Sequence, residues 1–293
     1  MSQVWKFPSL TGHRPPLMNL QQLRQTFLNL RKRWPQNWPG FDRVVQSALH
    51  QLGHSANEPL APRLQAMHAC ILEVAMQVEQ VGQAQAQHGR EPDYHNRLHI
   101  SDTLVALTAL LLQQRAVDQR AAQGPLSPQE WQMVLAICSH DLLHTGGINR
   151  YTSELEAQSL AALTPLMQRH GVMDEDQAAI GYMILQTDPS LVKASHQQVR
   201  QAPFDLTRLS CQTVLIQEAD ILASALPQIG EALTRQLSQE WSKIDPQRAQ
   251  SLLSVQARLF FLREMALFSS PASQRLGIQA VIDRHTASLV KSG

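Results

Sequence analysis

The sequence predicts an all-α protein, and three observations support that class. Apolar residues recur at the three- and four-residue spacing of an amphipathic helix along most of the chain. The alternating pattern of strands is nearly absent, and aromatic residues, which favour sheets, make up only 5% of the chain. A hydrophobic fraction of 43% and a charged fraction of 17% over 293 residues are typical of a globular chain with a sizeable core.

The predicted helices follow one another along the chain. The first is marked by an apolar stripe of Leu20, Leu23, Phe27 and Leu30. Residues 60–87 predict a long helix, because they are rich in Ala, Gln, Met and Leu. The same periodicity predicts helices over 98–115, 127–143, 153–170, 174–186, 206–224, 229–241, 246–268 and 273–291.

Capping residues support several of these helix boundaries. Ser127 precedes Pro128, and Glu130 follows in the first turn, which is the pattern of a helix N-terminus. Gly171 directly follows His170 and predicts the end of a helix.

The chain divides by composition near residue 58. Residues 1–58 are richer in proline and tryptophan and lack the histidine–aspartate motifs found later. We therefore predict an N-terminal helical extension, residues 1–58, packed on a main domain of residues 59–293.

Composition also limits the partners and the compartment. The net charge of +1 predicts no nucleic-acid partner. Cys70, Cys138 and Cys211 are widely spaced in apolar surroundings and indicate buried thiols in a reducing compartment. The N-terminus lacks the apolar segment of a secretory signal, and no apolar run is long enough to span a membrane. These features predict a cytoplasmic protein without a membrane partner, and they leave the oligomeric state open.

Two segments combine histidine with other potential metal ligands. His95 and His99 are four residues apart, so on a helix they would share a face. His140 and Asp141 are adjacent at the end of an apolar helix, and His144 follows one turn after His140.

A later aspartate completes the candidate metal site. Asp220 lies within the apolar run 214–226, and Asp141 also has apolar neighbours, so each carboxylate needs a partner. For Asp220 alone, an arginine or backbone donors at a helix end would be the preferred partner. Together with the histidines, however, the two aspartates favour a site for Zn, Mn, Fe or Mg.

Four motifs resemble the catalytic domain of cyclic-nucleotide phosphodiesterases, a branch of the HD-type metal-dependent phosphohydrolases. Their order and approximate spacing agree over residues 94–220, and the chain resembles a divergent, bacterial-like member. The resemblance implies an all-helical bundle with the metal site between central helices. The motifs are Tyr94-His95-Asn96-x-x-His99-x-x-Asp102, His140-Asp141-x-x-His144-x-Gly146-x-x-Asn149-x-Tyr151, Thr187-Asp188 and Ala219-Asp220.

The resemblance implies two divalent metal ions as cofactors. Histidines His99 and His140 and aspartates Asp141 and Asp220 would hold the tighter ion, expected to be zinc. Asp141 would also bridge to a second ion, expected to be magnesium or manganese and held mostly by water.

The resemblance also implies three catalytic residues that do not hold the tighter metal. His95 is similar to the proton donor for the leaving oxygen, and His144 would lie beside the waters of the second ion. Glu156 is similar to the glutamate that orients those waters, although Glu154 competes with it for this role.

Substrate contacts are less clearly marked in the sequence. Tyr94 and Asn149, within the motifs, are predicted contacts, and Gln256 with Phe260 is the predicted clamp for a purine. Residues 221–224, after the last aspartate, lack the asparagine that family members often carry there, so recognition of the base is altered.

The predicted function is hydrolysis of a small phosphorylated nucleotide, namely cAMP or cGMP, to the 5′-monophosphate. A hydroxide bridging the two metals would attack phosphorus, with His95 as the general acid. The alternatives are an HD-type nucleotidase or other phosphohydrolase, and a non-catalytic metal-containing protein with a sensing or scaffolding role.

Overall fold

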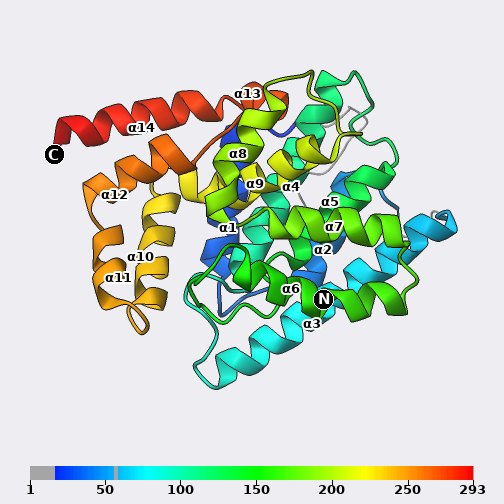
Figure 1. Cartoon of the computed structure of the whole chain (residues 1–293), viewed down its shortest axis with the longest axis horizontal. Helices are drawn as coiled ribbons and strands as arrows, with labels where there is room; N and C mark the ends of the chain where they lie inside the picture. Colours follow the sequence, from blue (N-terminus) through cyan, green and yellow to red (C-terminus); the bar gives the residue numbers. More distant parts are fainter. Residues whose placement is uncertain (1–16, 56–58, 293) are drawn as a thin grey trace.

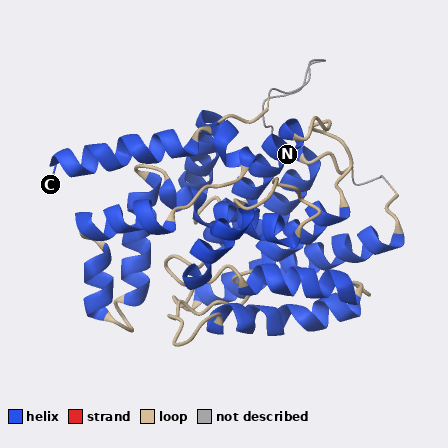
Figure 2. Cartoon of the chain, turned by 45° about the horizontal axis from the view of Figure 1, so that its top comes forward, coloured by secondary structure: helices blue, strands red, loops and turns tan. Residues whose placement is uncertain are grey.

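The computed structural model describes residues 17–55 and 59–292, and every regular element in these ranges is a helix (Figure 1, Figure 2). The predicted all-α class is therefore confirmed. The elements are α1 (Leu20–Arg33), α2 (Phe41–Gln51), α3 (Pro62–Gln87), α4 (Arg97–Val117), α5 (Pro128–Ser139), α6 (Glu154–Arg169), α7 (Asp174–Leu185), α8 (Pro189–Val199), α9 (Leu209–Ala225), α10 (Ile229–Trp241), α11 (Pro246–Leu252), α12 (Val255–Phe260), the π-helical turn η1 (Phe261–Met265), α13 (Pro271–Leu276) and α14 (Ile278–Ser292).

Helix α4 forms the centre of the hydrophobic core. Its side chains are buried on every face from Arg97 to Arg115, as expected of a helix that is apolar around its whole circumference. Helices α9 and α5 pack along it and are themselves almost wholly buried (Figure 1). The three helices that carry the predicted metal ligands are therefore the most rigidly enclosed elements of the fold.

The two helices from the predicted N-terminal extension pack on α3 and α4. Leu23 and Phe27 of α1 belong to the same continuous core as the side chains of α4. Arg31 of α1 also forms two hydrogen bonds, of 2.9 and 2.6 Å, with the carboxylate of Asp102, which is only 1% exposed. The core therefore continues across residue 59 without a break.

The ends of two helices decide how His95 and His144 are placed near the predicted site. Helix α4 begins at Arg97, because the side chain of Asn96 caps it by accepting hydrogen bonds from the backbone amides of Leu98 and His99. His95 therefore precedes the helix, and the predicted helical pairing of His95 with His99 is wrong. Helix α5 ends at Ser139, so His144 is placed by a turn rather than by a further turn of helix.

The sequence pattern missed or merged other elements. Helices α2 and α8 were not predicted, and the single helix predicted over 246–268 is divided into α11, α12 and η1. Asp188 and Pro189 start α8 with a side-chain cap and a first-position proline. The hydroxyl of Ser254 accepts a hydrogen bond from the amide of Ala257 and starts α12 as a separate helix.

Helices α10, α11, α12 and α14 form one edge of the molecule, and α14 extends along it to the C-terminus (Figure 1, Figure 2). Helices α10 and α11 pack against each other as neighbours. Among the described residues, none of the helices combines the length and the apolarity needed to cross a bilayer.

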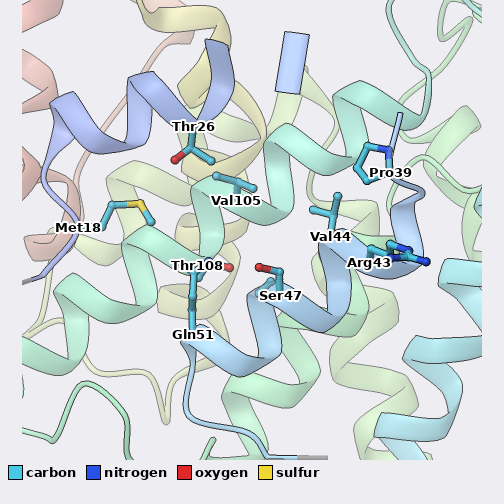
Figure 3. Close-up of a pocket in the computed structure, with 10 residues that line it drawn as sticks. Met18, Thr26, Pro39, Arg43, Val44, Ser47, Gln51, Val105 and Thr108 are labelled. Atoms are coloured by element: carbon cyan, nitrogen blue, oxygen red, sulfur yellow. The ribbon is translucent and has the colours of Figure 1, made fainter. Parts of the chain in front are cut away.

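A small cavity lies between α1, α2 and α4 (Figure 3). Its lining includes Met18, Val44 and Val105, and its volume of about 20 Å³ matches roughly one water molecule. This cavity is too small for a nucleotide.

Candidate active site

Four predicted metal ligands from three helical regions meet in the core. The Nε2 atom of His99 lies 3.2 Å from Asp141 Oδ2 and 3.3 Å from Asp220 Oδ1. The Nε2 atom of His140 lies 3.3 and 3.4 Å from the same two oxygens. Both imidazoles are at most 4% exposed. We call these four residues the ligand cluster.

The ligand cluster fits a divalent cation. Ligand atoms at the usual distances from a tetrahedral zinc ion lie about 3.3–3.6 Å apart, which matches the four separations. His140 donates from Nδ1 to the carbonyl oxygen of Ile137 at 2.8 Å, so its Nε2 is directed at the carboxylates. That Nε2 is buried and makes no hydrogen bond to any described residue. A metal ion would satisfy it.

The two carboxylates of the ligand cluster, on Asp141 and Asp220, need a positive charge beside them. Burial by itself would raise the pKa of Asp220, but the neighbouring imidazoles of His140 and His99 hold that pKa far below its ordinary value. Burial would likewise lower the pKa of His140, but Asp141 and Asp220 raise it to about 9. Two buried carboxylates are thus stabilised by protons on the imidazoles, or by a cation in their place.

Glu240 of α10 holds His95 beside the ligand cluster. His95 donates from Nδ1 to Glu240 Oε1 at 2.5 Å. The other carboxylate oxygen accepts the backbone amides of Tyr94 at 2.7 Å and His95 at 3.0 Å. Burial would raise the pKa of Glu240, but His95 and these amides lower it. The carboxylate therefore stays charged and fixes the imidazole and its backbone together.

Glu240 was not predicted from the sequence, because it is separated from His95 by 145 positions. One local signal was present. Glu240 lies seven residues after the buried Leu233 on α10, on the face that packs inward. A carboxylate on such a face needs a partner.

The loop after α5 makes room for this pair. Gly146 has a φ of +78°, and a Cβ at this position would lie 2.9 Å from Glu240 Cγ. Leu143, three residues earlier, also has a left-handed backbone with φ of +62° and is 44% exposed. The loop is therefore held in a strained conformation directly beside the candidate site.

His144 stacks on His95 with ring centroids 3.9 Å apart. Its Nδ1 accepts the amide hydrogen of Gly146 at 3.0 Å, so in the neutral ring the proton is on Nε2. Burial and the neighbouring His95 lower the pKa of His144 to about 4, which keeps it neutral. His95, Asp141 and His144 also bring one potential ligand atom each within 4.8 Å of one another.

Glu156 belongs to a carboxylate pair organised by Asn149. The side-chain amide of Asn149 donates to Glu156 at 2.9 Å and to Asp188 at 3.1 Å. Burial raises the pKa of Glu156, and the negative charges of Asp188 and Asp141 raise it further. Glu154 instead binds the backbone and guanidinium of Arg150. The geometry therefore favours Glu156 over Glu154 for a role at the metals.

The remaining predicted substrate contacts separate into two groups. Tyr94 packs on the rings of His95 and His99, each with centroids 4.7 Å away, and its hydroxyl is 3.1 Å from Ser224 Oγ. Gln256 is exposed, and Phe260 is 58% exposed.

The two residues of the predicted purine clamp lie on the short helix α12. Helix α12 turns its buried face inward through Arg258, which donates to the carbonyl oxygens of Ser224 and Leu226. Gln256 and Phe260 lie two residues on either side of Arg258 and are exposed, and a purine clamp formed by them stays a prediction.

Comparisons with known proteins support the fold. No family model and no curated protein matches the sequence. Among solved structures, LmjPDEB1 in complex with IBMX matches with a TM-score of 0.65 and 11% identity, covering 90% of each chain. The phosphodiesterase domain of the Salpingoeca rosetta rhodopsin phosphodiesterase matches with a TM-score of 0.58 and 15% identity, covering 94% of this chain and 88% of that one.

A second structure of the choanoflagellate domain, from the RhoPDE fusion protein, agrees with these matches. It has a TM-score of 0.59 and 15% identity, and the match covers 94% of this chain and 92% of that chain. Each of the three matches covers at least 90% of this chain. The chain therefore has the all-helical fold of phosphodiesterase domains.

Proposed function

We propose that the chain is a metal-dependent phosphodiesterase that hydrolyses a 3′,5′-cyclic nucleotide to the 5′-monophosphate. The observation that carries this proposal is the His95–Glu240 pair, which lies beside two histidines and two aspartates of metal-ligand geometry. A structural metal site would need only the closed set of ligands. The additional histidines and carboxylates around this one favour catalysis.

His99, His140, Asp141 and Asp220 would hold the tighter ion, and Asp141 would share its carboxylate with a second ion near His144 and Glu156. When bound, such ions supply a hydroxide nucleophile near neutral pH and neutralise charge on the phosphoryl oxygens. We infer zinc for the tighter ion and magnesium or manganese for the second.

His95 supplies the proton for the leaving group. As water adds its oxygen to phosphorus, the bond from phosphorus to the 3′-oxygen breaks, and that oxygen would take a proton from His95 Nε2. Glu240 occupies the Nδ1 side of the ring, so Nε2 is the nitrogen left for substrate. A carboxylate at this position stabilises the charged imidazole and sets its orientation.

His144 and Glu156 act around the phosphate. Neutral His144 presents an Nε2–H donor for a phosphoryl oxygen or a water molecule, because Gly146 occupies its Nδ1. Asn149 holds Glu156 in place to accept hydrogen bonds from water near Asp141. Tyr94 forms the wall between His99 and Ser224, against which the sugar or base would pack.

The same observation weighs against the alternatives. A diester with a poor alkoxide leaving group needs a proton donor more than a monoester with a good leaving group does. The His95–Glu240 pair therefore favours the phosphodiesterase over an HD-type nucleotidase. A sensing or scaffolding protein would need neither this pair nor the oriented His144.

The test is phosphoester hydrolysis by metal-loaded protein with cAMP, cGMP and an aryl phosphodiester. We expect turnover of a cyclic nucleotide, its loss in Asp141→Ala, and a decrease of about 10²–10⁴-fold in His95→Ala. Activity on the aryl ester alone would retain the metal chemistry and remove the nucleotide assignment. Inactivity of metal-bound protein on all three would favour the non-catalytic alternative.

A further inference from the structure

A second cavity lies next to the candidate active site. It is an open groove of about 650 Å³ between the loop that follows α5 and the turn that joins α10 to α11. This volume is within the range of small-molecule sites, roughly 300–1,000 Å³. The groove is lined by Ile148, Asn149, Arg150, Ile244, Asp245, Pro246, Gln247 and Arg248.

Each wall of the groove belongs to a chain segment that also contributes a residue to the candidate active site. On one side, the amide of Asn149 holds Glu156. On the other side, Ile244 lies four residues after Glu240, the partner of His95. The two walls approach each other at Gly146, which lies against the Glu240 side chain. A substrate seated on His95 thus has the groove directly beside it.

The groove contains the guanidinium groups of Arg248 and Arg150. Each contacts a neighbouring side chain and still has N–H groups that could donate to a ligand. Arg248 lies over the ring of Trp241, 4.7 Å from its centroid, and its guanidinium makes no hydrogen bond to any described residue. Arg150 binds Glu154 through Nε and Nη2, so its Nη1 has no partner in the described ranges. Planar guanidinium groups fixed in this way suit a phosphate.

The rest of the lining matches a nucleotide rather than a free anion. Asp245 is the only carboxylate of the groove, and it is occupied as the cap of α11, where it accepts the amide hydrogen of Arg248 at 2.9 Å. Ile148, Ile244 and Pro246 provide apolar surface for a sugar or a base. Gln247 adds an amide group that can bind a base edge.

We infer that this groove is a subsite for a second, phosphate-bearing nucleotide unit of the substrate. This inference rests on the proposed phosphodiesterase activity and extends the substrate class to phosphorylated dinucleotides. Hydrolysis proceeds as for the cyclic ester. Water adds its oxygen to the linking phosphorus, the bond to the 3′-oxygen breaks, and that oxygen receives a proton.

The experiment compares two linear dinucleotides that differ by one phosphate, ApA and its 5′-phosphorylated form pApA, on the metal-loaded full chain. A charge-assisted hydrogen bond contributes about 1.5–3 kcal/mol, so we expect kcat/KM for pApA to exceed that for ApA by at least about tenfold. In Arg248→Ala this preference should approach unity, while kcat/KM for cAMP is unchanged. Arg43→Ala, a matched change of an exposed arginine on α2, should keep the preference.

Equal kcat/KM for pApA and ApA in the wild type, or a preference that survives Arg248→Ala, would overturn the inference. If no nucleotide is hydrolysed, the proposed function fails, but the subsite is still tested by titration calorimetry. In that case tighter binding of pApA than ApA, lost in Arg248→Ala, supports the subsite, and equal binding excludes it. Thermal unfolding of each variant excludes misfolding as the cause.

Discussion

The backbone of Gly146 lies so close to Glu240 that a Cβ on Gly146 would be 2.9 Å from Glu240 Cγ. The glycine is thus needed both for its left-handed backbone and for the space that it leaves. We expect Gly146→Ala to displace Glu240 from His95 and to lower kcat by roughly tenfold, a loss equivalent to about 1.4 kcal/mol. Steady-state kinetics with the cyclic nucleotide that the wild type hydrolyses measures this loss.

Gly89→Ala is the matched control for Gly146→Ala. Gly89 also has a positive φ of +63°, but a Cβ there would meet nothing within 4 Å. Both variants should lose about 1–2 kcal/mol of stability through backbone strain. Only Gly146→Ala should lose activity, and equal kinetics in the two variants would argue against the role of Glu240 packing.

The charge of Glu240 is a second target. In Glu240→Gln the side chain keeps its size but no longer stabilises a charged His95, so we expect kcat to fall by about 10²-fold with little change in Tm. Glu264→Gln is the control, because Glu264 is a half-exposed carboxylate on η1 that pairs only with Lys193. A kcat within twofold of the wild type in Glu240→Gln would remove His95 as the proton donor.

Metal binding should stabilise the protein measurably. The ligand cluster holds two carboxylates that need positive charge, so zinc or manganese at roughly 100 times its Kd should raise the Tm by about 5–10 °C over chelator-treated protein. Asp220→Asn should lose most of this increase. Asp283→Asn, a change on the exposed face of α14, should retain it. An unchanged Tm in the wild type would show that the cluster binds neither ion.

A buried ion pair far from the active site should dominate local stability. Arg115 and Glu130 are 1% and 0% exposed, and Arg115 also donates to the carbonyl oxygens of Leu52, Ala122 and Gly124. Arg115→Met leaves Glu130 largely uncompensated, which should lower the free energy of unfolding by about 3–5 kcal/mol.

Urea unfolding measures the effect of Arg115→Met, with Arg120→Met as the control. Arg120 contacts the same carboxylate but is 39% exposed. Its removal should lower the free energy of unfolding by less than about 1 kcal/mol. Equal losses in the two variants would show that burial is not what makes the Arg115–Glu130 pair important.

Acid should destabilise the fold through His196. Burial and nearby Arg200 lower the pKa of its ring from 6.5 to about 4. Between these pH values the unfolded chain binds the proton more readily, so the stabilisation is complete above pH 6.5 and is lost as pH falls toward 4. The expected loss from this residue is on the order of 3 kcal/mol.

Urea unfolding of the wild type and His196→Gln at a series of pH values tests this expectation. The stability curve of His196→Gln should be flatter between pH 6.5 and 4, whereas His50→Gln, on the exposed face of α2, should follow the wild type. Parallel curves for the wild type and His196→Gln would assign the acid sensitivity to other groups.

Local patterns in the sequence predicted much of the fold, because helical periodicity depends on neighbouring residues. Periodicity alone did not locate α8, because the start of this helix depends on the Asp188 cap. It also did not show that the helix predicted over 246–268 is divided at Ser254. Much of the ligand cluster could be predicted from two short motifs, one that contains His99 and one that contains the adjacent His140 and Asp141. These short motifs define residue types and spacing, which is what metal coordination requires.

The partners of those motifs could not be predicted in the same way. Glu240 contacts His95 from α10, 145 positions further along the chain, and no spacing rule connects residues so far apart in sequence. The placement of Gln256 and Phe260 likewise depends on tertiary contacts, since Arg258 of α12 donates to the carbonyl oxygen of Ser224 in α9. Tertiary packing, rather than local propensity, fixed these positions.

The bond between Arg31 and Asp102 has a consequence for engineering this protein. Asp102 lies one turn along α4 from His99, and Arg31 of α1 supplies its charge partner. A truncated protein that starts after residue 58 would leave this carboxylate buried and unpaired, at a cost of about 3–5 kcal/mol, in the helix that carries the metal ligand. A reporter or sensor module should therefore be fused upstream of α1, so that the first two helices remain within the catalytic unit.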